Sequence, residues 1–140
     1  MIRRIAVLVA VSLILQAGAI WAAGSEKEKA AVSSAERWLR VIDEGKYAES
    51  WKDAAEPFRN AVTQAQWEQS LQAVRKPLGR SLSRTIQSKT YKTSLPGAPD
   101  GEYVVIQFTT SFEKKKSAVE TVTPMRDRDG TWRVSGYYIK

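Results

Sequence analysis

The chain has 140 residues, of which 43% are hydrophobic and 26% are charged, and its formal net charge is +7. These fractions are typical of a soluble globular chain with one domain, and they exclude a disordered polymer and a protein with several membrane spans. The sequence contains no cysteine and no histidine, which excludes disulfides, thiolate nucleophiles, catalytic triads with histidine and the common zinc sites.

The N-terminus has the order of features of a secretory signal peptide. Met1 to Arg4 carries two positive charges, Ile5 to Ala19 is mostly apolar, and residues 22–24 are small. Small side chains at the last and third-last positions before the cut predict cleavage after Ala22 or Gly24. The order of these features therefore predicts a protein of the periplasm or the extracellular medium.

Two interpretations of this segment remain open. If it is cleaved, residues 1–24 are the signal peptide and residues 25–140 form a single domain. If it is retained, residues 5–23 are a membrane anchor, since a spanning helix needs about 20 apolar residues. Contact with a membrane is expected only through this segment, and only when it is uncleaved.

The next part of the chain has the apolar spacing of a helix that ends at Gly45. Ser33 with Glu36, or Ser25 with Glu28, can form the capping box at its start. The apolar stripe consists of Ala31, Ala35, Trp38, Leu39 and Ile42.

Two further helices are predicted. The second runs from about Tyr47 to Glu56 and is broken by Pro57. The third begins at a capping box of Thr63 and Gln66 and finishes by about Lys76.

After Gly79 the apolar period changes from 3.6 to 2, which predicts strands. They span residues 81–92, 102–113, 118–125 and 131–139, with polar connections at 114–117 and 127–130. Helices followed by an antiparallel meander predict an α+β domain with the helices packed on one face of the sheet.

Several segments together resemble a known family. They are Trp51, Phe58 and Trp67, the segment 75–79, the loop 95–101 leading into Tyr103, and the ending 132–138. In these segments the chain resembles the bacterial family known only as domain of unknown function 4019 (DUF4019). The resemblance implies a cone similar in layout to nuclear-transport-factor-2-like or cystatin-like domains, in which a curved antiparallel sheet of about four strands wraps helices and often leaves a pocket. It implies no catalytic residue, because the family has no assigned activity.

Aromatic side chains are the first candidates for a ligand site, because pockets are mostly apolar and aromatic. Packing in the core is the alternative for each of them. The candidate pocket residues are Trp51, Phe58, Trp67, Tyr103, Phe112, Trp132 and Tyr137.

A basic stretch is the second candidate. Residues 69–99 contain six bases and no acid, and such a stretch can form a face that attracts anions. Strand alternation predicts Arg84 and Lys92 on the same side and Lys89 opposite. A solvated surface with no ligand is the alternative. The candidate anion face consists of Arg75, Lys76, Arg80, Arg84 and Lys92.

These patterns favour a non-catalytic binding module for a small molecule, a peptide or an anionic envelope polymer. The alternative is a small enzyme of the isomerase, dehydratase or hydrolase type, in which Glu120 or Asp100 transfers a proton and Tyr137 or Tyr103 donates to a substrate oxygen. A buried carboxylate with a raised pKa that faces a closed pocket would favour the enzyme. We expect no cofactor, no metal and no nucleic-acid partner, and a bridge from Arg75 to a carboxylate such as Glu120 is conceivable.

Overall fold

The first helix is much longer than the sequence predicts. The computed structural model describes the backbone of residues 8–140 and the side chains of residues 26–140, and α1 spans Leu8–Asp43. Neither Ser25 nor Ser33 is the N-cap of α1, because both residues lie inside the helix. It ends as predicted at Gly45, whose φ of +77° suits glycine and whose N–H donates to the carbonyl of Ile42.

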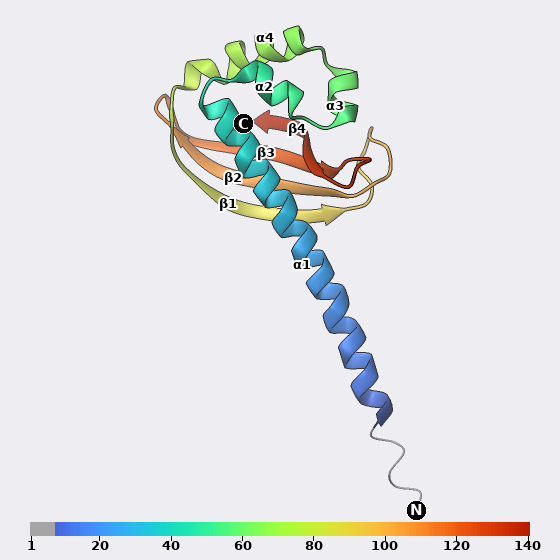
Figure 1. Cartoon of the computed structure of the whole chain (residues 1–140). Helices are drawn as coiled ribbons and strands as arrows, with labels where there is room; N and C mark the ends of the chain where they lie inside the picture. The colour runs from blue at the N-terminus through green and yellow to red at the C-terminus, as the bar shows by residue number, and fades with distance from the viewer. Residues whose placement is uncertain (1–7) are drawn as a thin grey trace, which may run out of the picture.

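The N-terminal part of α1 extends beyond the rest of the domain (Figure 1). Within the described residues, no helix has an apolar stretch long and continuous enough to cross a membrane. The predicted start of the mature chain, at Ala23 or Ser25, lies inside α1 and remains a prediction.

Three short helices follow where the sequence predicts two. They are α2 (Tyr47–Lys52), α3 (Glu56–Ala61) and α4 (Gln64–Val74), followed by the 3₁₀ turn η1 (Lys76–Leu78). The prediction for Pro57 was wrong: it starts α3, because the first turn of a helix does not use the missing N–H. The capping box of α4 is confirmed, with Gln66 N–H donating to Thr63 Oγ1 at 3.2 Å and Thr63 N–H donating to Gln66 Oε1 at 3.0 Å.

The second half of the chain is an open sheet of four antiparallel strands. These are β1 (Ser81–Lys92), β2 (Tyr103–Phe112), β3 (Lys115–Arg126) and β4 (Trp132–Ile139), in the order β1-β2-β3-β4. The predicted α+β layout is confirmed. The third strand begins at Lys115 rather than at residue 118, because the turn between β2 and β3 is shorter than predicted.

The core lies between α1 and the inner face of the sheet. In Figure 1, α1 crosses one face of the bowed strands, while α2, α3 and α4 gather beside β4. The stripe of α1 predicted from the sequence is buried, with Trp38 4% exposed. It packs with Val104, Ile106 and Phe108 of β2, which gives the domain one main core.

A bulge in β1 overturns the predicted side-chain directions. The register pairs Ile86 with Phe108 but Ser88 with Gln107, so one extra residue lies in β1 at this point. Arg84 pairs with Thr110 and Lys92 pairs with Tyr103, seven positions apart along β2, so the two basic residues lie on opposite faces. Lys89 pairs with Ile106, four positions from Thr110, so it lies on the same face as Arg84 rather than opposite it. Both predictions were wrong because a bulge shifts the alternation by one residue.

Candidate functional site

Most of the predicted pocket aromatics fill the core. Trp67 packs edge-on against Phe58 with ring centroids 4.9 Å apart, and it lies 6.5 Å from the Tyr137 ring. Trp38, which the sequence analysis placed only in the core, lies 6.0 Å from Trp67 and 5.3 Å from Tyr137. The interior is therefore occupied by the aromatic rings themselves.

The indole N–H groups in this aromatic cluster are satisfied by the protein. Trp38 donates to the carbonyl of Ser50 at 2.8 Å, and Trp67 donates to the Ser50 hydroxyl at 2.9 Å. Trp51 donates to the carbonyl of Val62 at 2.7 Å. Because these donors already have protein acceptors, they hold α2 and α4 against α1 and are not available to a ligand.

Of the other three candidate pocket residues, Phe112 and Tyr103 lie apart from this cluster, and Trp132 lies at the margin of the core. Phe112 is fully buried at the end of β2, and Tyr103 packs with Ala55 and Met125 in a second, smaller core. Trp132 is partly exposed and lines a surface hollow. The structure therefore does not bring the seven aromatic residues around one cavity.

A network of charged side chains crosses the core. Glu120 on β3 is 0% exposed, and its carboxylate accepts hydrogen bonds from Arg84 Nε at 2.8 Å and from the Thr110 hydroxyl at 2.5 Å. The hydroxyl of Tyr137 donates to the second oxygen of Glu120. Burial, together with the neighbouring Glu120 carboxylate, raises the pKa of Tyr137 well above its ordinary value, so this phenol stays a neutral donor.

Asp43, at the C-terminal end of α1, joins two arginines in this network. Its carboxylate accepts from Arg84 Nη1 at 2.8 Å, from Arg84 Nη2 at 3.0 Å and from Arg75 Nη2 at 3.2 Å. Burial pushes the pKa of Asp43 upward, but the hydrogen bonds and charges of the two guanidinium groups outweigh it, so the pKa lies below its ordinary value. Arg75 also donates to the carbonyl of Gly79 and lies over the Phe112 ring. Asp43 thus joins the end of α1 to the end of α4 and to β1.

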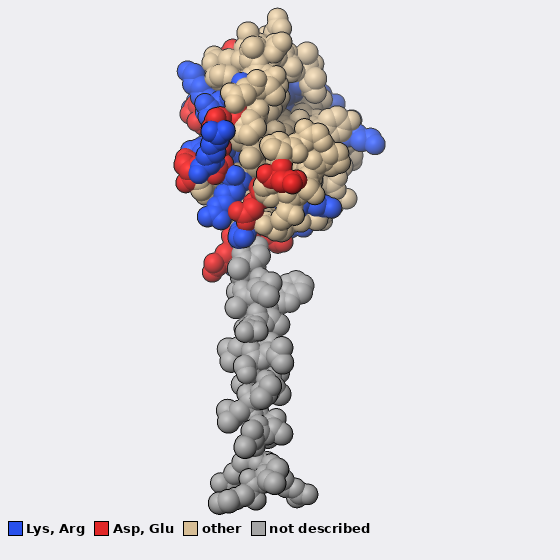
Figure 2. All heavy atoms as spheres, turned by 90° about the vertical axis from the view of Figure 1, so that its right-hand side faces the viewer, with Lys and Arg blue, Asp and Glu red and all other residues tan. Residues whose placement is uncertain are grey.

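The candidate anion face is not assembled on one surface. Arg75 is 3% exposed, and Arg84 points inward to Asp43 and Glu120. Arg80 pairs with Glu113 at 3.2 Å, which leaves Lys76 and Lys92 exposed on different elements. On the side of the domain shown in Figure 2, basic and acidic side chains interleave rather than gather by sign. Alternating charge of this kind weakens any summed field.

The residues of the enzyme alternative are engaged elsewhere. Three protein donors surround Glu120, and its side chain has no exposed surface, so a substrate has no access to it in this structure. The carboxylate that bridges to Arg75 is Asp43 rather than Glu120. Asp100 is exposed in the loop before β2. Among the described residues there is no group of three acidic side chains placed to hold a metal.

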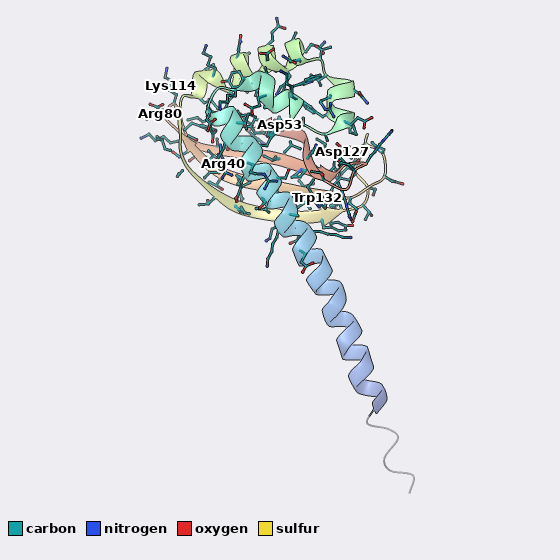
Figure 3. The ribbon with its side chains drawn as sticks, in the orientation of Figure 1. Arg40, Asp53, Arg80, Lys114, Asp127 and Trp132 are labelled. Carbon is teal, nitrogen blue, oxygen red and sulfur yellow. The ribbon has the colours of Figure 1, made fainter. Side chains whose placement is uncertain are left out.

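The remaining candidate is an open hollow of about 530 Å³ between α1, the end of α2 and the start of β4. Trp132 and Asp53 lie on the same side of α1 in Figure 3, beside this hollow. It is lined by Ser34, Arg37, Trp38, Val41, Lys52, Asp53, Thr131, Trp132 and Arg133.

The hollow has an excess of positive charge. Arg37 and Lys52 are exposed and make no ion pair with any residue whose side chain the structure describes. Arg133 is held by Asp129, with a 2.8 Å contact to each carboxylate oxygen. Asp53 is the one acidic residue among those lining the hollow. Basic groups beside a half-buried indole suit an anion with an aromatic or apolar body.

Arg37 and Lys52 are not predicted from the sequence as site residues. Both lie outside the acid-free stretch, in a part of the chain where acids and bases alternate. The available signal was helical spacing: Ser34, Arg37 and Val41 lie three and four residues apart, so they share one face of α1. Only the position of β4 shows that this face borders a hollow.

Most of the chain matches the model of a known protein family. A family model described as "Protein of unknown function (DUF4019)" matches residues 34–137, from the last third of α1 almost to the end of β4. The chain belongs to the DUF4019 family. The matched range of this DUF4019 domain contains the whole charged network and the lining of the hollow. Neither the curated proteins nor the solved structures include a match to it.

Proposed function

We propose that this DUF4019 protein is an exported, non-catalytic binding module that holds a small anionic ligand in the hollow between α1, α2 and β4. The observation that carries the proposal is the pair of cations, Arg37 and Lys52, that border a hollow of about 530 Å³ beside Trp132 without a carboxylate partner among the described side chains. A volume in the range of about 300–1,000 Å³ is usual for small-molecule sites.

The walls of the hollow are joined, which supports a preformed site. The hydroxyl of Ser34 on α1 donates to the carbonyl of Trp132 on β4 at 2.7 Å. The N–H of Ala55, just after α2, donates to the carbonyl of Val134 at 2.8 Å. When the walls of a site are fixed before binding, less conformational entropy is lost as the ligand binds. Modest contacts with the ligand are then sufficient.

The charges define the class of ligand. Arg37 and Lys52 supply two formal positive charges, whereas Asp53 supplies one negative charge. Because Arg133 is already neutralised by Asp129, the excess charge comes from Arg37 and Lys52. The ligand carries a carboxylate, sulfonate or phosphate group that approaches these two side chains, and its apolar body rests on Trp132.

The proposal that the protein is exported rests on the N-terminal sequence. The basic start, the apolar run and the small residues at 22–24 are the features that direct secretion. The absence of cysteine leaves the domain independent of the redox state of its compartment.

Fluorescence titration with anilinonaphthalene sulfonate, an aromatic anion, tests the binding site. Replacing Arg37 and Lys52 together by glutamine is expected to weaken binding by roughly tenfold or more, because a hydrogen bond to a charged group contributes about 1.5–3 kcal/mol. The matched control replaces Lys116 and Lys140 by glutamine, which removes the same charge at exposed positions outside the hollow.

The expected result is weaker binding in the first variant and unchanged binding in the control, with near-ultraviolet circular dichroism showing an intact fold in both. Equal affinity of the two variants would contradict the site. Loss of binding in both would show that the probe responds to net charge alone.

A further inference from the structure

The two edges of the sheet differ in how their backbone groups are used. At the β4 edge, the side chain of Ser34 and the N–H of Ala55 occupy the carbonyl oxygens of Trp132 and Val134. At the β1 edge, β2 is the sole neighbouring strand, and no other described element donates to or accepts from the backbone of residues 81–92. An edge strand directs every second N–H and C=O away from its neighbour. The β1 edge is therefore free to pair.

The β1 edge also has exposed apolar side chains. Leu82 is 57% exposed and Ile86 is 42% exposed, and both are in the first half of β1. In the second half, Lys27 of α1 lies over the Tyr91 ring, so the helix covers the inner face of the strand at that end. The inner face of β1 is thus accessible in its first half, whereas the opposite face, which carries Lys92, is exposed at the far end of the strand as well.

A second hollow lies beside this accessible half, on the side of α1 away from Trp132. It measures about 420 Å³, and Figure 3 places Arg40 and Trp132 on opposite sides of α1. Its lining consists of Glu36, Arg40, Arg84, Thr85, Ile86 and Phe108. A strand added along β1 would direct alternate side chains into this hollow.

The charge of β1 restricts what can pair with it. The strand contains Arg84, Lys89 and Lys92 and no acidic residue. Arg84 is neutralised inside the core, but Lys89 has only a 4.0 Å contact with Glu28, and Lys92 has no ion pair among the described side chains. Pairing of β1 with the β1 of a second copy would bring these bases together, which like-charge repulsion opposes. An acidic strand meets no such penalty.

We propose that the free edge of β1 binds an extended acidic peptide segment of a partner protein, which adds a strand to the sheet and places an apolar side chain in the hollow beside Ile86. Backbone hydrogen bonds supply the affinity, while Lys92, which lies on the face of β1 opposite the hollow, selects acidic side chains on that face of the bound strand. This interaction is independent of the proposed small-anion site, because the two surfaces lie on opposite sides of α1.

Binding of three short capped peptides to the full-length protein tests the proposal. The first alternates valine with glutamate, the second alternates valine with lysine, and the third is the first with alternate backbone nitrogens methylated to remove the donors. We expect the glutamate peptide to bind at least about tenfold more tightly than the other two, with hydrogen exchange slowed along β1.

Two single variants localise the effect. Lys92→Glu is expected to remove the preference for the glutamate peptide over the lysine peptide. Lys116→Glu makes the same change of charge outside β1 and should leave the preference intact.

Three results would overturn the proposal. Equal affinity of the methylated peptide and its parent would show that strand pairing is not the mode of binding. Protection confined to β4 or to the Trp132 hollow would place the peptide elsewhere. Light scattering that shows a dimer dissociated by Leu82→Lys would identify a second copy as the occupant instead.

Discussion

Replacing Asp43 by asparagine separates the buried charged network from an ordinary surface ion pair. The change keeps the size of the side chain but removes the negative charge that faces both Arg75 and Arg84. Their side chains are 4% and 15% exposed, so water replaces little of the lost interaction. An amide also presents N–H donors where the guanidinium groups need an acceptor.

The expected cost follows from these contacts. Removing one partner of a buried ion pair costs about 3–5 kcal/mol. The lower end applies because Arg84 keeps Glu120 as a partner and Asp43 itself is 20% exposed. A loss of about 3 kcal/mol is a large part of a total stability near 5–15 kcal/mol. It corresponds to a fall in Tm of roughly 10 °C for a domain of this size.

Urea unfolding followed by tryptophan fluorescence measures this loss, because the protein has five tryptophans. Glu44→Gln is the matched control on the neighbouring residue. Its pair with Lys46 is 3.0 Å long, but both side chains are 58% exposed, so we expect a change within about 0.5 kcal/mol. If Asp43→Asn and Glu44→Gln lowered the free energy of unfolding equally, the network would contribute no more than a surface pair.

Three further predictions follow from the structure and the sequence. Trp67→Ala should lower the free energy of unfolding by about 3–5 kcal/mol, since its ring packs on Phe58 and Trp38 and its N–H is bonded to Ser50; a Tm change of under about 2 °C would contradict this. Stability should be nearly constant from about pH 5.5 to 8 because the chain has no histidine, and should fall below about pH 4. Asp43 has a lowered pKa in the folded state. Burial raises the pKa of Asp127, but hydrogen bonds from the N–H groups of Glu56 and Arg128 and from Arg133 outweigh it, so this pKa is lowered too. The stabilisation from both carboxylates is lost as they protonate, and a step in the urea midpoint near pH 6.5 would contradict this. Intact-mass analysis of material from the periplasm should give a mature chain that starts at Ala23 or Ser25, whereas a full-length chain in the membrane fraction would support the retained anchor.

The sequence by itself determined the elements whose causes are local. The capping box at Thr63 and the left-handed glycine after α1 act within four residues, and both are where the sequence predicts them. Apolar periodicity likewise identified the buried stripe of α1, because side-chain direction follows from the period of the element. Together with the change of period after Gly79, these features were sufficient to establish the α+β order.

Tertiary structure decided which charges meet. Asp43 and Arg84 are 41 residues apart in the sequence, and Arg84 and Glu120 are 36 residues apart. No local sequence pattern relates these residues. The acid-free stretch 69–99 predicted an exposed anion face, but two of its arginines, Arg75 and Arg84, point into the core. The bulge in β1 changed the side on which Lys92 lies, since alternation holds only while the register is regular. The hollow beside Trp132 lies where β4 meets the helices, which Ser34 and Ala55 join to it by hydrogen bonds, and such long-range contacts form only when the whole chain has folded.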